Sequence, residues 1–388
     1  MNPIRSPRLQ ALAPYMFVEI DRKKRQALHA GRDIIDLGIG DPDRPTPAFI
    51  RRRMAEAIED PATHRYPPER GLPEFRQQAA AFLSHRFGVR LDPDTQIIAL
   101  IGSKEGLAHL PLTVVDPAQH VLIPQPAYPV YRAATIFAGG LPYEIPLSQA
   151  NAWLPDLDAI PPDIRRNARL MYLNYPNNPT AAVATNDFYR RAVDFARQHD
   201  ILIVQDAAYS EIYFDQRPIS ILQAPGALDV AVEIHSLSKT FNMTGWRLAF
   251  AAGNADALAA LAALKANIDS GQFAAIQLAG AQALAQADHV EVTAMLDIYR
   301  ERRDLLVAGL RQAGFTVATP SATFYVWAQC PPGYTSIAAA TRLLDQANVV
   351  MVPGVGFGPA GEGYLRAALT VELQRIRQAV DRIVSLKW

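Results

Sequence analysis

The 388-residue chain contains a single cysteine, Cys330, and carries no net charge. One cysteine cannot form a disulfide within the chain, so we expect a reducing compartment, the cytoplasm. The 38 Lys and Arg residues balance the 38 Asp and Glu residues, which removes the overall attraction that nucleic acids and anionic membranes require. We therefore expect neither partner, and we expect any anionic ligand to be held by local arginines.

Long apolar runs are also missing. No segment approaches the ~20 apolar residues of a membrane-spanning helix, and residues 1–25 lack the apolar core and cleavage site of a secretory signal. Hydrophobic residues make up 49% of the chain and charged residues 20%, a balance typical of globular proteins rather than disordered ones. A chain of this length can form two domains with a sizeable core.

Short apolar runs alternate with helical stretches from about residue 34 onward. Helical periodicity covers residues 72–87, 105–114 and 187–198. The predicted strands are residues 34–39, 96–101, 121–123, 170–173, 201–204 and 230–234. This alternation indicates an α/β protein with a parallel sheet covered on both faces. In such sheets ligands bind beyond the carboxyl ends of the strands, so motifs that directly follow strands are candidates for a site.

A second, smaller α/β unit is expected after an alanine-rich helical stretch at residues 254–309. Its predicted strands are residues 324–327, 349–352 and 364–369, and a helix at residues 371–384 closes the chain. We divide the chain into an N-terminal segment (1–40), a large domain (41–282) and a small C-terminal domain (283–388).

Lys239 lies in the run His-Ser-Leu-Ser-Lys-Thr-Phe-Asn-Met-Thr-Gly-Trp-Arg at residues 235–247. A lysine beside two serine hydroxyls, with an arginine eight positions later, suits a cofactor that carries both an aldehyde and a phosphate. The amine would form a Schiff base, and Ser236, Ser238 and Arg247 would hold the phosphate. A single lysine is more often a surface group, so the interpretation depends on further motifs.

Asp206 ends the apolar run at residues 201–205, at the carboxyl end of a predicted strand. It could simply cap a turn or a helix. Alternatively, a buried carboxylate there would keep the pyridine nitrogen of a cofactor protonated, so that the ring accepts electron density. Tyr209, three residues later, could donate to the ring's phenolic oxygen or be an ordinary loop aromatic.

Asn178, in Asn-Tyr-Pro-Asn-Asn-Pro-Thr at residues 174–180, follows another predicted strand. It either forms a turn or donates to the same phenolic oxygen. Ser103 and Lys104 lie where a strand gives way to a helix, whose N-terminus can bind an anion or merely be well capped. Tyr128 could stack on the cofactor or pack within a loop.

Arg366 lies inside an apolar strand of the second unit. A buried arginine needs a partner. A substrate carboxylate held by two parallel hydrogen bonds would serve, and so would an internal Asp or Glu.

These motifs together resemble the class I and II aminotransferases of the pyridoxal-phosphate fold type I superfamily. The resemblance implies a mostly parallel seven-stranded sheet in the large domain, with pyridoxal 5'-phosphate bound as a Schiff base to Lys239. It implies that Arg247 and Ser236 bind the phosphate, Asp206 the pyridine nitrogen and Arg366 the substrate α-carboxylate. Tyr66, in His-Arg-Tyr-Pro, matches a tyrosine that reaches the phosphate of a neighbouring subunit, which implies a homodimer. No metal is implied.

Within that superfamily the chain is most similar to the LL-diaminopimelate aminotransferases. The similar stretches are residues 14–15, 36–42, 101–106, 242–247, 324–327 and the Gly-Phe-Gly around Phe357. The resemblance implies transfer between LL-diaminopimelate and 2-oxoglutarate, with tetrahydrodipicolinate as the lysine-pathway partner, and places Tyr15, Gly40 and Lys104 at the substrate. Ala181 departs from the family, which has glycine there; if φ is positive, alanine costs about 1 kcal/mol.

Other functions reuse nearly the same residues. The donor could be N-succinyl-diaminopimelate, aspartate, alanine or an aromatic amino acid, and a carbon–sulfur β-lyase of the same fold is a further alternative. A cofactor-sensing regulator would carry a DNA-binding module ahead of this fold. Since the pattern begins close to Met1 and the charge is neutral, we expect an enzyme.

Overall fold

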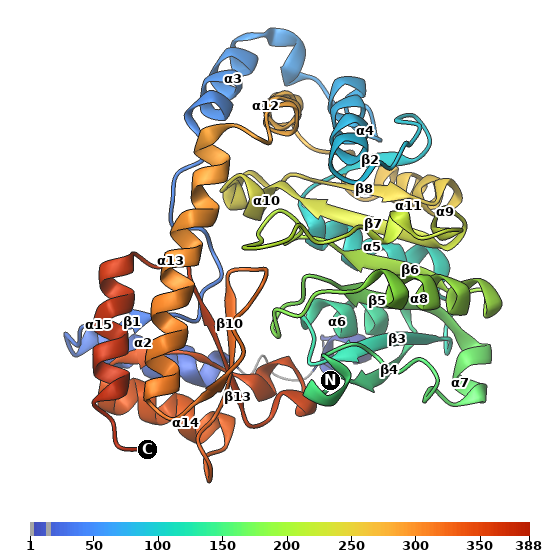
Figure 1. The fold of residues 1–388 in the computed structure, drawn as a ribbon. Coiled ribbons are helices and arrows are strands. Elements are labelled where there is room, and N and C mark those ends of the chain that lie inside the picture. Colours follow the sequence, from blue (N-terminus) through green and yellow to red (C-terminus); the bar gives the residue numbers. More distant parts are fainter. Residues whose placement is uncertain (1–3, 13–16) are drawn as a thin grey trace.

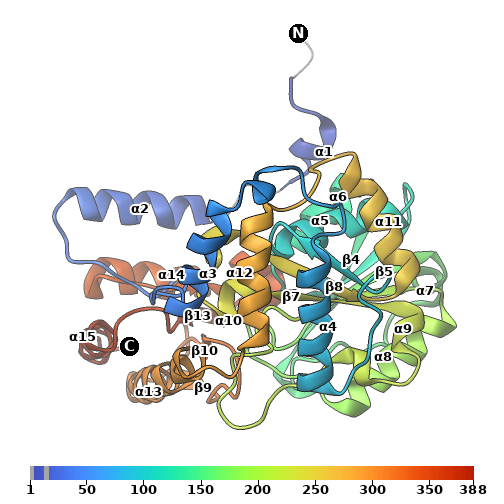
Figure 2. The same ribbon diagram turned by 90° about the horizontal axis from the view of Figure 1, so that it is seen from above.

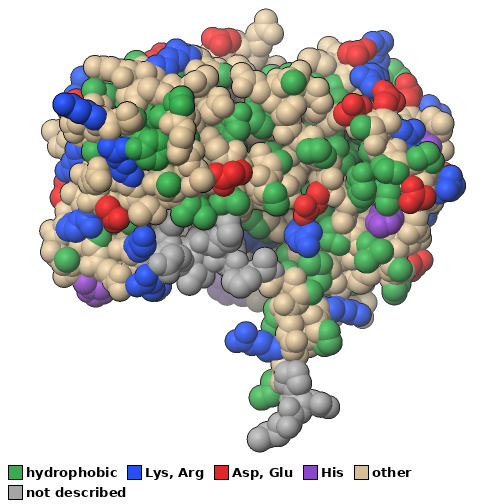
Figure 3. All heavy atoms as spheres, turned by 90° about the horizontal axis from the view of Figure 1, so that it is seen from below, with side chains coloured by type: hydrophobic (Ala, Val, Ile, Leu, Met, Phe, Trp, Pro, Cys, Tyr) green, Lys and Arg blue, Asp and Glu red, His purple; other side chains and the backbone are tan. Residues whose placement is uncertain are grey.

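The computed structural model describes residues 4–12 and 17–388. It consists of a large domain built on a seven-stranded sheet and a smaller domain built on a four-stranded sheet, joined by the long helix α13 (Val290–Gln312) (Figure 1). Among the described residues, no helix is long and apolar enough to cross a membrane. Figure 3 shows positive and negative side chains interspersed over the lower face of the molecule.

The large sheet has the strand order β2-β8-β7-β6-β5-β3-β4. Its strands are β2 (Ile97–Leu100), β3 (His120–Gln125), β4 (Leu141–Pro146), β5 (Ala168–Asn174), β6 (Leu202–Asp206), β7 (Ala231–Ser236) and β8 (Ala249–Gly253). Every pairing is parallel except the two that β8 makes with β2 and β7. The prediction of a mostly parallel seven-stranded sheet is therefore confirmed.

Helices cover both faces of this sheet because its strands are apolar on both sides. On one face lie α5 (Ser103–Val114), α6 (Val130–Ala138) and α11 (Ala255–Ala266) (Figure 2). On the other lie α4 (Pro73–Phe87), α8 (Asn186–Gln198) and α12 (Ala274–Ala285). Alternate residues of one strand enter different cores: Ile203 packs on the second face and Val204 on the first.

The small domain contains the antiparallel sheet β12-β13-β10-β9. Its elements are β9 (Thr316–Val317), β10 (Tyr325–Gln329), α14 (Ser336–Arg342), β11 (Val349–Val350), β12 (Val352–Pro353), β13 (Tyr364–Ala368) and α15 (Leu373–Val384). The remaining helices are α1 (Pro7–Gln10), α2 (Phe17–His29), α3 (Ala48–Glu59), α7 (Pro162–Asn167), α9 (Ala227–Val230) and α10 (Leu237–Thr240).

Two sequence-based predictions of strands need correction, and some strands were not predicted. The predicted strand at 34–39 is reduced to β1 (Ile35–Asp36), which pairs in parallel with β11 and so attaches the N-terminal segment to the small domain. The single strand predicted at 349–352 is divided into β11 and β12, which join different sheets. Strands β4 and β8 were not predicted: β4 contains two prolines, which an edge strand tolerates, and β8 is largely alanine and glycine.

The loop after β5 is held by its own asparagines. The Asn174 side chain accepts a hydrogen bond from the Asn178 backbone (2.8 Å), and Asn177 accepts from the Thr180 backbone (2.9 Å). The loop carries Ala181 at φ +61°, buried at 6% exposure. The departure from glycine noted above therefore falls on a left-handed residue, where a side chain is strained.

Replacing Ala181 by glycine should raise the free energy of unfolding by about 1 kcal/mol, because the left-handed strain outweighs the loss of one buried methyl group and the added chain entropy. Urea unfolding of the cofactor-free protein measures the change. Ala182→Gly, at a neighbouring residue without positive φ, is the matched control and should destabilise. A lower stability for Ala181→Gly would show that the left-handed alanine is unstrained.

Candidate active site

A cavity of about 560 Å³ lies at the carboxyl ends of three adjacent parallel strands. The last residues of β5, β6 and β7 (Asn174, Asp206 and Ser236) all line it. The full lining comprises Gly40, Ser103, Lys104, Tyr128, Pro129, Asn174, Asn178, Asp206, Ala208, Tyr209, Ser236, Ser238, Lys239, Thr244, Arg247, Tyr325, Phe357 and Arg366. Both domains therefore contribute to one cavity.

Two predicted site residues are not part of this lining. Tyr66 is 91% exposed and does not line the cavity of its own chain. Tyr15 lies outside the described residues. All other predicted site residues are brought together in the cavity, although they are distributed from residue 40 to residue 366 of the chain.

Lys239 lies in α10, the short helix that directly follows β7. The Ser236 side chain starts this helix by accepting a hydrogen bond from the Ser238 backbone (3.2 Å). The Lys239 ammonium donates to the Gly40 carbonyl (2.8 Å). Burial lowers the pKa of Lys239 to about 8, so a neutral amine, the form that acts as nucleophile or base, is accessible near neutral pH.

Asp206 is a deeply buried carboxylate of the cavity wall. Its Oδ1 accepts from the Ala208 backbone (3.2 Å) and its Oδ2 from the hydroxyl of Tyr131 (2.8 Å). Burial raises the pKa of Asp206 to about 6, against the lowering effect of these two hydrogen bonds. The carboxylate is therefore ionised at neutral pH but close to its protonated form.

Tyr131 was not identified from the sequence. It is 2% exposed on the first turn of α6 and stacks on Tyr172 with ring centres 4.6 Å apart. The sequence did contain one indication of its role: Tyr131 lies three residues after the predicted site residue Tyr128. Residues three apart at the start of a helix lie on the same side. Only the folded sheet shows that its hydroxyl meets a carboxylate 75 residues away.

Another part of the cavity wall, formed by the start of α5 and by Arg247, presents hydrogen-bond donors that could hold an anion. Ser103 is the first residue of α5, and Gly102 before it has φ +75°. A side chain at Gly102 would bring its Cβ into collision with Nη2 of Arg247, so glycine is required for the arginine to lie against this turn. Helix N–H groups, serine hydroxyls and a guanidinium together are typical of a phosphate site.

Arg366 projects from β13 toward the large domain. Nη1 donates to Oδ1 of Asn178 and Nη2 to the Gly38 carbonyl, both at 2.8 Å. Its guanidinium lies over the rings of Tyr325 (4.2 Å) and Phe357 (4.8 Å). Within the described part of the chain, no carboxylate pairs with Arg366 and its buried Nε has no partner, so the positive charge is available to an acidic ligand.

The side chains of Asn178 and Tyr209 complete the wall. Because arginine only donates, the Asn178 oxygen faces Arg366 and the amide nitrogen is left for a ligand. The Tyr209 hydroxyl meets the Tyr325 hydroxyl at 3.1 Å. Tyr325 was also not identified from the sequence, although its hydroxyl packs so closely on Gly40 that a Cβ there would collide with it.

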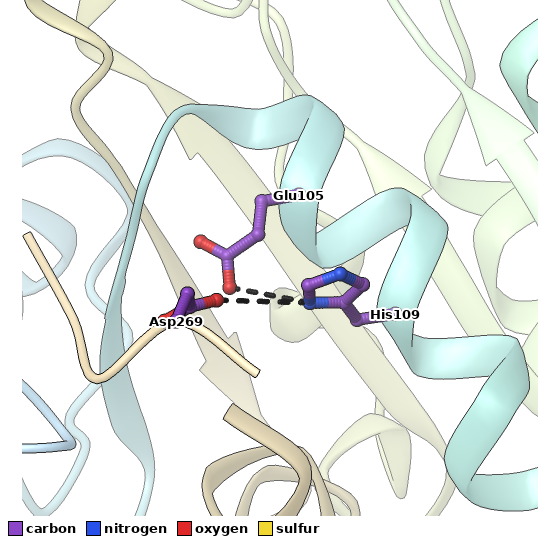
Figure 4. A group of neighbouring side chains, drawn as sticks. All are labelled: Glu105, His109 and Asp269. Atoms are coloured by element: carbon purple, nitrogen blue, oxygen red, sulfur yellow. Dashed lines mark ion pairs between the residues drawn. The ribbon is translucent and has the colours of Figure 1, made fainter. Parts of the chain in front are cut away.

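Three potential metal ligands meet beside α5. Glu105 and His109, on successive turns of the helix, face Asp269 (Figure 4). The ammonium of Lys265 lies between the carboxylates: it hydrogen-bonds to Glu105 and to Asp269 (3.0 Å). Since a lysine already neutralises these carboxylates, the cluster does not require a metal ion to explain it.

Comparison with known proteins agrees with this geometry. Residues 32–383 match the family model for aminotransferase class I and II. The chain belongs to this family. It is 52% identical to LL-diaminopimelate aminotransferase from Syntrophobacter fumaroxidans (99% of each chain covered), and 51% identical to that from Aquifex aeolicus (98% of this chain, 99% of the other).

Solved structures of similar proteins have the same fold as this chain. Substrate-bound BacF from Bacillus subtilis has a TM-score of 0.94 at 37% identity, covering 99% of this chain and 98% of the other. A probable N-succinyldiaminopimelate aminotransferase from Thermus thermophilus has a TM-score of 0.90 at 38% identity, covering 95% of this chain and 99% of the other. The protein is therefore an enzyme, an aminotransferase, whose substrates are amino acids and keto acids.

The burial of Asp206 predicts a stability effect in the cofactor-free protein. Its pKa is raised from 3.8 to about 6, so the ionised form destabilises the fold above pH 6, and this cost disappears below about pH 4. Asp206→Asn should therefore raise the free energy of unfolding by about 1–3 kcal/mol at pH 8, with the gain shrinking as the pH falls through 6 toward 4. Urea unfolding at several pH values measures it.

Asp288→Asn is the control, and it should change the free energy of unfolding in the opposite direction. Burial acts to raise the pKa of Asp288, but the hydrogen bond from Arg86 brings it below its usual value, so this substitution should destabilise at pH 8. If Asp206→Asn destabilised the cofactor-free protein equally at pH 8 and pH 5, the buried charge would not carry the cost assigned to it.

Proposed function

We propose that this aminotransferase holds pyridoxal 5'-phosphate in the cavity, with Lys239 as covalent anchor and base, and transfers the amino group of LL-diaminopimelate to 2-oxoglutarate. The observation that carries the proposal is the meeting, in one cavity, of an amine with a lowered pKa, a buried carboxylate and an anion cradle. Tetrahydrodipicolinate and glutamate are the expected products.

The residues present fit this cofactor. Asp206 would face the pyridine nitrogen, Tyr128 the ring, and Ser103, Ser236, Ser238 and Arg247 the phosphate, with Tyr209 and Asn178 at the phenolic oxygen. The missing side chain at Gly102, which lets Arg247 approach the start of α5, supports the phosphate assignment. Bound pyridoxal phosphate supplies an electron sink for the negative charge that develops at the substrate α-carbon.

The protein's own groups then perform the proton transfer. The Lys239 amine, buried and near its pKa at neutral pH, would take the proton from the substrate α-carbon. Asp206, with a pKa of about 6, is ionised at neutral pH and would keep the pyridine nitrogen protonated. Arg366 grips the α-carboxylate in parallel hydrogen bonds, with Asn178 keeping the guanidinium in place.

The identity of the amino donor rests on two supports. Relatives 52% and 51% identical over nearly the whole chain are LL-diaminopimelate aminotransferases. Lys104 also lines the cavity, with Nζ 5.8 Å from the centre of the Tyr128 ring, and offers a cation for the distal carboxylate. We assign Gly40 and Tyr15 to the same substrate end. N-succinyl-diaminopimelate is the second candidate, favoured by the likeness to the Thermus protein.

The proposal extends to assembly and location. We assign Tyr66, which is 91% exposed on its own chain, to the phosphate site of a second copy in a homodimer. The enzyme is assigned to the cytoplasm, in keeping with its single cysteine. Residues 1–40, 41–282 and 283–388 are proposed as the N-terminal segment, the large domain and the small domain.

Lys239→Ala should lower kcat/KM more than about a thousandfold, because both the covalent anchor and the base are lost. Steady-state kinetics measures the loss, and borohydride reduction in the presence of pyridoxal phosphate should no longer label the peptide around residue 239. Lys24→Ala is the control: this lysine pairs with Asp36 outside the cavity. Normal turnover of Lys239→Ala would exclude the assignment.

A donor panel with 2-oxoglutarate tests the substrate. LL-diaminopimelate should give the highest kcat/KM among itself, N-succinyl-diaminopimelate, aspartate, alanine and aromatic amino acids. Lys104→Met should reduce kcat/KM for LL-diaminopimelate about tenfold or more and spare alanine, which has no distal carboxylate. Arg366→Ala should damage every donor. An aromatic preference would refute the diaminopimelate assignment, and pyruvate and ammonia released without an acceptor would indicate a β-lyase.

A further inference from the structure

Lys265, near the end of α11, is a fully buried lysine at 0% exposure that lies outside the active-site lining. Its ammonium hydrogen-bonds to Oε1 of Glu105 and to both carboxylate oxygens of Asp269 (3.0 and 3.3 Å). Buried lysines are rare and require such partners. Glu105 is linked by one further hydrogen bond to the turn before α5, and Asp269 is linked through Gly271 and Gln272 to the backbone of Arg247.

The Glu105 side leads to the start of α5. Glu105 lies in the first helical turn (Figure 4), and its Oε2 accepts from the backbone N–H of Ile101. This bond closes the turn that contains Gly102 and Ser103, the turn against which the Arg247 guanidinium lies. Glu105 therefore fixes the direction of the helix N–H groups and of the Ser103 hydroxyl relative to the cavity.

The Asp269 side leads to Arg247 itself. Oδ1 of Asp269 accepts from the Gly271 backbone (3.0 Å), and the next residue, Gln272, donates to the carbonyls of Trp246 (2.9 Å) and Arg247. Arg247 has φ +56°, in the left-handed region. Burial acts to raise the pKa of Asp269, but hydrogen bonds from Gly271 and Lys265 bring it below its usual value, so the carboxylate stays ionised.

We propose that Lys265 is a positioning residue for the phosphate end of the cavity, because its single ammonium ties the turn at residues 101–105 to the loop at 269–272 and so sets the spacing between Ser103 and Arg247. The inference rests on the proposed function, in which that end of the cavity binds the cofactor phosphate. Without Lys265, two carboxylates would also be left close together beneath an anion site. Nδ1 of His109 also lies near both carboxylates, 3.5 Å from Glu105 and 4.0 Å from Asp269, but it makes no hydrogen bond among the described residues.

The test compares pyridoxal phosphate with pyridoxal, which lacks the phosphate, as ligands of the cofactor-free protein. In titrations followed by absorbance, Lys265→Met should weaken pyridoxal phosphate binding about tenfold or more and change pyridoxal binding less than about twofold, since only the phosphate end is displaced. Inorganic phosphate should compete correspondingly less well in the variant. A purely structural role for Lys265 would weaken both aldehydes together.

Two further variants keep the test decisive. Gln272→Leu removes the donors to the Trp246 and Arg247 carbonyls without removing a charge, and should shift the preference in the same direction by a smaller factor, even if Lys265→Met does not fold. Arg303→Met removes another buried cation, one that donates to the Pro320 carbonyl in the small domain. It should lower the melting temperature and leave the ratio of the two affinities unchanged.

Wild-type preference for pyridoxal phosphate in both Lys265→Met and Gln272→Leu would overturn the positioning role and leave the proposed function intact. Failure of the wild-type cofactor-free protein to bind pyridoxal phosphate would instead overturn the proposed function, and this inference with it.

Discussion

The chemistry of the active-site cavity depends on a carboxylate that is buried at the end of a central strand. Asp206 ends β6, and burial raises its pKa to about 6, while burial lowers the pKa of Lys239, just beyond the neighbouring β7, to about 8. The removal of water therefore brings an acid and a base toward neutral pH from opposite directions. Because β6 and β7 end at one edge of the sheet, both groups enter a single cavity. A buried charge that destabilises the empty protein is typical of a site organised for a ligand rather than for stability.

The small domain contributes the group that recognises acidic ligands. Arg366 is held by neutral oxygens of Asn178 and Gly38 and by aromatic faces, rather than by a carboxylate. Its charge is thus oriented without being neutralised. Near the start of α5, the ammonium of Lys265 neutralises the carboxylates of Glu105 and Asp269. Arg247 lines the cavity.

The sequence by itself determined the α/β class, the parallel strands and the positions of the chemical motifs. Strands such as β6 and β7 are predictable because both of their faces are buried and each contains or adjoins a short apolar run. The site motifs can be recognised in the sequence because binding and activating the cofactor requires particular residue types, and these lie directly after predicted strands. At Ala181 the sequence showed a departure from the family's glycine, and the structure shows that the residue has a positive φ.

Only the tertiary structure decided which distant residues meet. The Tyr131–Asp206 and Lys265–Glu105 contacts and the pairing of β1 with β11 join segments 75, 160 and more than 300 residues apart. No local pattern encodes such contacts, because hydrogen bonds between side chains depend on how the sheet and its helices pack. The orientation of β8 likewise became clear only in the folded sheet, where it runs antiparallel to both β2 and β7.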